Sequence, residues 1–126
     1  MIIGIGTDMI EIERVLKSCQ NPRFLERYYT QAERELIQKR KCRCATHFAA
    51  KEAVSKVLGT GFRSFTPKEI EVLRNELGKP YVVLYGRALE LSRSLGIERI
   101  HISLTDTKEY AAAFAIGEGA DSCNIS

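Results

Sequence analysis

The residues best suited to chemistry in this sequence are two carboxylates and a lysine, Asp8, Glu52 and Lys56. Asp8 follows the apolar start "MIIGIGT", where a β-strand is expected to stop. A carboxylate at that point can cap the next helix or bind a metal ion. Glu52 and Lys56 are four residues apart, a spacing that is typical of a solvated ion pair on one helix face. Spacing alone leaves both roles open.

Two neighbouring features favour a ligand near Glu52. Phe48 falls on the same polar helix face, and an exposed aromatic side chain there suggests that something covers it. Gly59-Thr60-Gly61 follows the helix and offers flexible backbone N–H groups that can approach a phosphate closely. Ordinary helix capping explains Gly59 equally well.

The elements that would position these residues begin with a short strand and a helix. Residues 2–6 are β-branched and glycine-rich, which predicts a buried strand. Asp8 followed by Glu11 has the pattern of a capping box that opens a helix. The apolar face predicted for that helix consists of Met9, Ile12, Val15, Leu16 and Cys19.

Two further helices are predicted in the first half. Thr30 with Glu33 is a capping signal for a basic helix over residues 31–42. The segment "FAAKEAVSKVLGTG" predicts the strongest helix of the chain, ended by Gly59. Its apolar face consists of Ala50, Ala53, Val54, Val57 and Leu58.

The second half changes to the period of strands. "EIEVLRNE" and "KPYVVLYG" predict a hairpin with a turn over residues 77–80, and "RALELSRSLG" predicts a helix closed by Gly96. "RIHISLTD" and "EYAAAFAIG" predict a last pair of strands. The expected fold class is α+β, with N-terminal helices packed on a mainly antiparallel sheet. We expect one domain over residues 1–117 and a flexible polar tail over 118–126.

Composition indicates a soluble, cytosolic protein. The chain has 126 residues, of which 44% are hydrophobic and 28% charged, as expected for one globular domain. No apolar run approaches the ~20 residues of a membrane span, and the start lacks the basic leader of a signal peptide. The four cysteines form no CxxC pair, so we expect reduced, partly buried thiols.

The net charge of +3 is too small to indicate a nucleic-acid partner. Basic residues nevertheless gather in the first half of the chain, densest over residues 34–43. A solvated helical surface is the default interpretation of such a run. A surface that steers an acidic partner is the alternative.

Four blocks, "GIGTDMIEIER", "HFAAKEAVSKVLGTG", "ELGKPYVVLYGRA" and "ISLTDTKEYAAAFAI", together resemble the bacterial holo-acyl-carrier-protein synthases. These are the small 4′-phosphopantetheinyl transferases, and the resemblance runs from Met1 to about Ile116. The resemblance implies the 4′-phosphopantetheinyl transferase fold. It also implies transfer of the 4′-phosphopantetheine arm from coenzyme A to a serine of apo acyl carrier protein. This reaction serves fatty acid biosynthesis and releases adenosine 3′,5′-bisphosphate. The resemblance also implies Mg²⁺ as the cofactor and a homotrimer with active sites between subunits.

The resemblance implies roles for individual residues. Asp8 and Glu52 match the metal-binding carboxylates, and the proton acceptor for the serine is Glu52 or a metal-ordered water. Lys56 matches the lysine that contacts the coenzyme A phosphates. Arg14 matches an arginine associated with docking of the acidic carrier protein. The loops that surround the nucleotide in the family correspond to Gly59, Thr60, Gly61, Lys79 and Pro80.

The sequence departs from the family pattern at two places near the nucleotide. His47 stands where many members have arginine, and Thr105-Asp106 stands where many have serine or threonine followed by histidine. Asp106 is a standing negative charge at neutral pH, so a cation or Mg²⁺ would have to separate it from a pyrophosphate. It can equally close the turn into the last strand.

Two other classes of function are weighed against the transferase. A non-catalytic basic module that binds RNA lacks the aromatic strand on which bases would stack. An acyltransferase that uses coenzyme A lacks a plausible Ser/His/Asp set or Cys/His pair.

Overall fold

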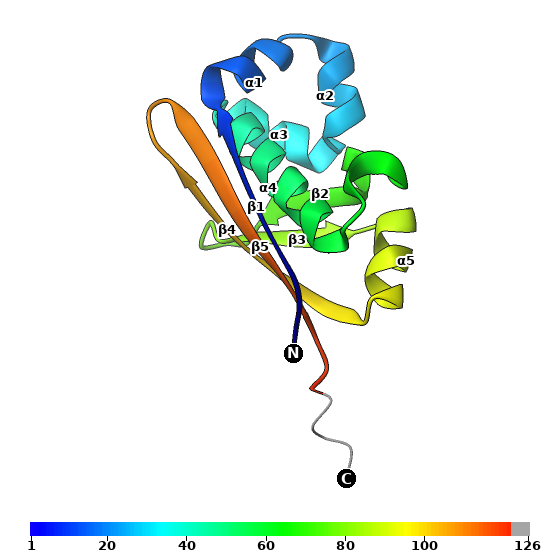
Figure 1. The fold of residues 1–126 in the computed structure, drawn as a ribbon. Helices are drawn as coiled ribbons and strands as arrows, with labels where there is room; N and C mark the ends of the chain where they lie inside the picture. Colours follow the sequence, from blue (N-terminus) through cyan, green and yellow to red (C-terminus); the bar gives the residue numbers. More distant parts are fainter. Residues whose placement is uncertain (122–126) are drawn as a thin grey trace.

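The protein is described here by a computed structural model, which places residues 1–121. Its elements form an α+β fold, as predicted (Figure 1). No helix in this part of the chain is long and apolar enough to cross a membrane. The elements are, in order, β1 (Ile2–Glu11), α1 (Ile12–Ser18), α2 (Pro22–Tyr28), α3 (Gln31–Lys39), α4 (Arg43–Leu58), β2 (Ile70–Arg74), β3 (Pro80–Leu84), α5 (Gly86–Ser94), β4 (Ile97–Asp106) and β5 (Tyr110–Gly119). Two short 3₁₀ turns, Gly61–Arg63 and Pro67–Glu69, link α4 to β2.

The strands form two antiparallel sheets. The larger has the order β1-β5-β4, and the smaller is the β2-β3 hairpin. β5 therefore pairs with the strand nearest the N-terminus on one side and with its own hairpin partner on the other. In this register Asp8 lies opposite Ala113.

Helix α4 packs directly on β1 and β5 and carries most of the core (Figure 1). Small side chains allow this close approach: Ala53 on α4 and both Ala113 and Ala115 on β5 are buried. A Cβ on Gly4 would lie 2.9 Å from the Val57 carbonyl oxygen, which is closer than real Cβ atoms come. The first strand thus needs glycine where it crosses the helix.

The structure corrects the prediction for the start of the chain. β1 continues to Glu11, so Asp8 lies inside the strand and does not cap a helix. Helix α1 has Glu11 as its N-cap residue, with no side-chain capping bond. Met9, predicted for the apolar helix face, is a strand residue with 68% of its surface exposed. Pairing with β5 extends the strand beyond the point where the local sequence suggests a stop.

Other local predictions are confirmed. Thr30 and Glu33 form the predicted capping box, although the helix that they open ends at Lys39 and not at residue 42. Gly59 ends α4 in the left-handed conformation, with a φ of 83°. At the other end of the chain, β5 includes Glu118 and Gly119, which the sequence assigned to the tail. The rest of the predicted tail, residues 122–126, lies outside the described residues.

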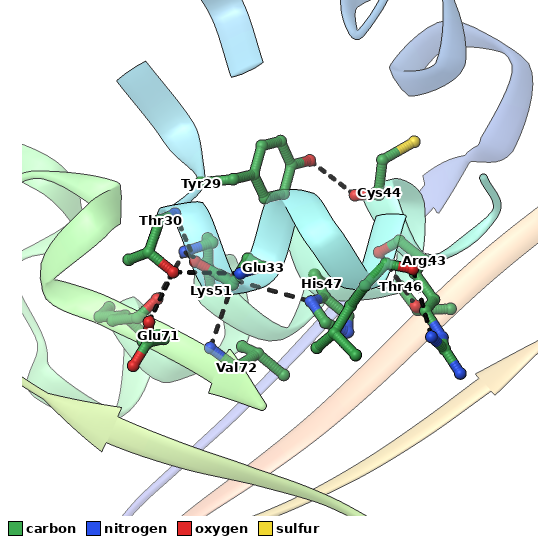
Figure 2. Close-up of polar contacts among 12 residues, drawn as sticks. Tyr29, Thr30, Glu33, Arg43, Cys44, Thr46, His47, Lys51, Glu71 and Val72 are labelled. Atoms are coloured by element: carbon green, nitrogen blue, oxygen red, sulfur yellow. Dashed lines mark hydrogen bonds and ion pairs between the residues drawn. The ribbon is translucent and has the colours of Figure 1, made fainter. Parts of the chain in front are cut away.

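A buried polar cluster joins α3, α4 and β2 (Figure 2). Lys51 Nζ donates to Glu33 Oε1 at 2.8 Å and to the carbonyl oxygens of Pro67 and Ile70 at 2.9 and 2.6 Å. The other Glu33 oxygen accepts from the Val72 backbone N–H. All three ammonium protons of Lys51 therefore have acceptors, as a fully buried charge requires.

Candidate active site

Asp8 and Glu52 face each other because β1 lies tightly against α4. Asp8 alternates with Gly4 and Gly6 on the strand face that packs on the helix. A Cβ on Gly6 would overlap the Ala53 carbonyl oxygen. Ala53 directly follows Glu52, so the missing side chain at Gly6 lets the two carboxylates approach each other.

The environment of Asp8 suits a cation. Its side chain is only 17% exposed, and its Oδ2 atom is buried with no hydrogen-bond partner. Burial raises the pKa of the Asp8 carboxyl, and Lys56 partly offsets this. Burial also raises the pKa of Glu52, and the negative charge of Asp8 raises it further. Two half-buried carboxylates that repel each other are stabilised by a positive ion between them.

Lys56 takes part in this site and not in the ion pair that its spacing suggests. Its Nζ donates to the Thr7 carbonyl oxygen at 2.7 Å and lies 3.5 Å from Asp8 Oδ1. The structure shows no ion pair between Lys56 and Glu52 within residues 1–121. Lys56 therefore brings a positive charge from α4 to the strand, beside the carboxylates.

The Gly59–Gly61 loop follows Lys56 directly. Gly59 and Gly61 have φ angles of 83° and 60°, which favour glycine. Both positions have open space where a Cβ would be. The loop is therefore accessible at its glycines, as close approach to a phosphate would require.

Lys79, Pro80 and Asp106 come together elsewhere, in a cavity of about 480 Å³ between the β3 start and the β4 end. Arg40, Arg43 and Arg74 also line this cavity, so it is strongly cationic. Asp8, Glu52 and Lys56 are not part of its lining. The residues predicted to bind the metal and coenzyme A thus fall into two groups within one chain.

The arginines of this cavity lack full hydrogen bonding. The Nε atoms of Arg43 and Arg74 are buried and have no partner. Burial lowers the pKa of Arg74, as do the charges of Arg43 and Arg40, while Asp106 acts in the opposite direction. Several desolvated guanidinium groups with spare donors are suited to an anion such as a phosphate.

Arg14 lines a third region, a groove of about 460 Å³ on the side of α1. Its other walls include Phe24, Tyr28 and Phe48. Phe48 is half-buried and stacks on Tyr28 with ring centroids 5.2 Å apart, so the exposed aromatic side chain expected from the sequence is wrong. Phe48 lies one helical turn before Glu52 on α4, and Met9 of the groove directly follows Asp8 on β1, so the groove begins next to the carboxylates.

His47 lies outside the cationic cavity. It is fully buried, and its Nδ1 lies 3.6 Å from Glu33 Oε2 in the polar cluster of Figure 2. Burial lowers the pKa of His47, and the Glu33 carboxylate opposes that shift. The departure from the family pattern at this position therefore affects the interior of the domain.

Sequence reasoning missed part of this arrangement. Arg40 and Arg43 stood out only as members of a basic run, and Arg74 was not singled out. Arg74 ends β2, five residues before Lys79 in the turn of the hairpin. The sequence signal that could have indicated this anion site was a pair of basic residues, Arg74 and Lys79, on the two sides of a tight turn.

Comparison with known proteins identifies the family. Residues 4–115 match the family described as the 4′-phosphopantetheinyl transferase superfamily, and the chain belongs to it. The holo-[acyl-carrier-protein] synthase of Lachnoclostridium phytofermentans is 55% identical over 118 residues, which cover 94% of this chain and 97% of the relative.

Solved structures agree with this assignment. An acyl carrier protein synthase of Plasmodium yoelii with ADP bound has a TM-score of 0.85 at 30% identity and covers 96% of this chain and 98% of its own. The holo-(acyl-carrier-protein) synthase of Bacillus anthracis, in complex with CoA (3′,5′-ADP), has a TM-score of 0.78 at 32% identity, with 95% and 99% coverage. The fold expected from the resemblance is therefore confirmed.

Proposed function

We propose that this protein transfers the 4′-phosphopantetheine arm of coenzyme A to a serine of apo acyl carrier protein. The observation that carries the proposal is the pair of facing carboxylates, Asp8 and Glu52, with Lys56 beside them, in a chain of this family. The names of the relatives support a synthase of this kind and not the RNA-binding module. A cytosolic location stays a prediction.

Mg²⁺ is the proposed cofactor, held by Asp8 and Glu52. The unpartnered Oδ2 of Asp8 and the mutual repulsion of the two carboxylates support this assignment. Mg²⁺ prefers one or two carboxylates, and takes its remaining ligands from waters and substrate phosphates. When bound, it would neutralise charge on the pyrophosphate as the nucleotide leaves.

The chain's own groups have separate tasks in this reaction. Lys56 is placed to contact a phosphate next to the carboxylates, because its Nζ is tethered to Thr7 and half of its side chain stays exposed. Gly59, Thr60 and Gly61 present accessible backbone next to it. Glu52, with its raised pKa, is the protein group suited to accept the proton of the attacking serine hydroxyl.

The nucleotide end of coenzyme A is proposed to bind in the cationic cavity with Lys79, Pro80 and Asp106. Its arginines offer spare donors to phosphate oxygens. Arg74 and Lys79 would separate the Asp106 carboxylate from the bound anion. Because this cavity does not include the carboxylates of the same chain, we propose that a complete site combines groups of two copies.

A homotrimer is the proposed assembly. The face of the β1-β5-β4 sheet turned away from α4 is strongly apolar: Ile5 is 71%, Met9 68% and Phe114 61% exposed in the single chain. The register places Ile5 opposite Ile116 and Met9 opposite Ala112, so these side chains form one continuous surface. A surface of this kind is typical of an interface between copies.

Carrier protein is proposed to dock at the groove that contains Arg14. An exposed arginine beside stacked aromatic rings suits an acidic partner that also offers apolar contacts. Phe48 of the groove lies one helical turn before Glu52, so a serine on a partner docked there would lie near the carboxylates.

One experiment tests the proposed function. Apo acyl carrier protein, coenzyme A and the purified protein are incubated with Mg²⁺, and the carrier is weighed by mass spectrometry. We expect the carrier to gain the mass of one phosphopantetheine, and expect no gain when EDTA replaces Mg²⁺. In a parallel reaction with acetyl-coenzyme A, a gain of the acetyl group alone would indicate the acyltransferase. An unchanged carrier in both reactions would contradict the transfer reaction.

A further inference from the structure

Two cysteines that the proposed reaction does not use lie together between α1 and α4. Cys19 is the C-cap residue that directly follows α1, and Cys44 is the second residue of α4. Both belong to the apolar cluster around Tyr29. Both are free thiols, one half-buried and the other buried.

Tyr29 connects the two residues. Its hydroxyl donates to the Cys44 carbonyl oxygen at 2.6 Å (Figure 2), and the Cys19 sulfur lies 3.8 Å from the same hydroxyl. The Tyr29 ring is completely buried, so it forms a fixed wall beside the thiols. Both thiols thus lie around one tyrosine hydroxyl, and each thiol is the largest influence on the pKa of the other.

The two thiols differ in character. The neighbouring Cys44 lowers the pKa of Cys19, against the effect of burial. The pKa of Cys44 is raised, first by Cys19 and then by burial. Thiolate character and access to solvent determine which cysteine reacts with an oxidant. Cys19 has both, and Cys44 has neither.

We propose that Cys19 and Cys44 are a modification site, a thiol pair that hydrogen peroxide converts to a disulfide. The Cys19 thiolate attacks one peroxide oxygen and breaks the O–O bond, which gives Cys19 sulfenic acid. The hydroxide that leaves takes the proton released by Cys19 and becomes water. The Cys44 sulfur then displaces hydroxide from the Cys19 sulfur, and this hydroxide takes the Cys44 proton. Each thiol loses one hydrogen atom, and the peroxide is reduced to two waters.

The position of Cys19 permits the closure. It follows a helix of only seven residues and begins the short turn that leads into α2. Such a segment can shift until the sulfurs reach the bonding distance of about 2.05 Å. The disulfide would tie the end of α1, the helix that carries Arg14, to the first turn of α4.

Cys42 provides the matched control. It is half-buried like Cys19, but it lies on the cationic cavity and has no thiol bonded to it among residues 1–121. Trypsin cuts after Lys17, Arg23, Arg43 and Lys51, so Cys19, Cys42 and Cys44 fall on three different peptides.

The test is peptide mapping of the full-length protein after exposure to hydrogen peroxide and alkylation of the remaining thiols. We expect peptides 18–23 and 44–51 to appear cross-linked, with the loss of two hydrogen atoms. Before oxidation, Cys19 should be alkylated at least about tenfold faster than Cys44. The readout is peptide mass, which is independent of catalysis.

Three variants separate the outcomes. Cys42→Ser should give the same yield of cross-link within about twofold, whereas Cys19→Ser and Cys44→Ser should abolish it. In Cys44→Ser, the Cys19 sulfenic acid should persist and react with dimedone. A cross-link through Cys42 or Cys123 would overturn the proposal. Oxidation of Cys19 to sulfinic acid without any cross-link, in the protein without substitutions, would also overturn it. Peptide mapping of the protein without substitutions shows whether Cys19 and Cys44 form a disulfide, even where a variant fails to fold.

Discussion

At the scale of single residues, the buried Oδ2 of Asp8 makes the carboxylate pair testable. We expect Asp8→Asn and Glu52→Gln each to lower kcat by about a hundredfold or more. Losing a partner that only orients a ligand costs about 10–100-fold, so losing a ligand should cost at least as much. The loss should be smaller at high Mg²⁺, and the measurement is a Mg²⁺ titration of carrier-protein modification. Glu90→Gln, on exposed α5, is the control and should match the unchanged protein.

The alternative to metal binding gives the opposite result for Asp8. A purely structural carboxylate in a strand should tolerate the isosteric Asn with little change in rate. Near-normal turnover of both variants at low Mg²⁺ would contradict the proposal that Asp8 and Glu52 bind Mg²⁺.

The second residue-scale prediction concerns Arg14. Arg14→Ala should raise the KM for carrier protein by about three- to tenfold and leave the KM for coenzyme A unchanged, because a rim charge acts on encounter and docking. The unchanged protein should also lose rate as salt rises. Arg93→Ala removes an equally exposed arginine from α5 and should affect neither KM. If Arg14→Ala raises both KM values equally, Arg14 does not act in docking of the carrier protein.

The sequence singles out Asp8, Glu52 and Lys56, and the structure brings them close together, but their roles at a site stay predictions. Asp8, Glu52 and Lys56 stand in specific motifs, and their types limit the chemistry that they can perform. Arg74 is separated from Arg43 by about thirty residues of chain, and only tertiary packing brings both guanidinium groups to one cavity. No local pattern carries that information.

At the scale of elements, the cluster of Glu33, Lys51 and His47 holds α3, α4 and β2 together, and it predicts acid sensitivity. The folded pKa of His47 lies below its usual 6.5, chiefly because of burial. The stabilising contribution is therefore complete above about pH 6.5 and is lost as the pH falls toward the folded pKa. Glu33, whose pKa is also lowered, adds a loss in the same direction below about pH 4.5.

Urea denaturation at fixed protein concentration between pH 8 and 5.5 measures this effect. The free energy of unfolding should fall across that range, and in His47→Gln this fall should be smaller by about 1 kcal/mol. His101→Gln, which removes the pair of His101 with Glu118 on β4, is measured in parallel as the comparison for the other histidine of the sequence. An unaltered slope in His47→Gln would show that another group causes the acid loss.

Elements were predictable where their signals are local. The Thr30–Glu33 box and Gly59 are decided by residues within one helical turn, and both predictions are confirmed. The end of β1 is decided by pairing with β5, far along the chain, so the local pattern after Gly6 pointed wrongly to a helix cap. Partial burial of Phe48 likewise depends on the neighbouring helix α2.

At the scale of the whole molecule, the apolar sheet face predicts how the protein assembles. Phe114→Lys should convert the proposed trimer to monomers, since it places a charge at the centre of that face. Sedimentation of Phe114→Lys should then give the mass of one chain. Its activity should be lost as the trimer dissociates, because the proposed site is divided between copies. Tyr81→Lys, on the separate β2-β3 hairpin, is the control. A monomeric variant with full activity would contradict a site shared between subunits.

The pairing of β1 with β5 has a further consequence, for the order in which the chain folds. β1 is an edge strand with β5 as its only neighbour in the described sheet, and Asp8 lies opposite Ala113. At about 5–20 residues per second, a ribosome needs roughly 5–20 s to reach β5 after making β1. Until then the strand "IIGIG" has no partner, and closing so long a loop is slow. Asp8 therefore lies on a strand whose pairing is completed last. In a nascent chain only the packing of β1 on α4 can hold the two carboxylates together before the β4-β5 hairpin has formed.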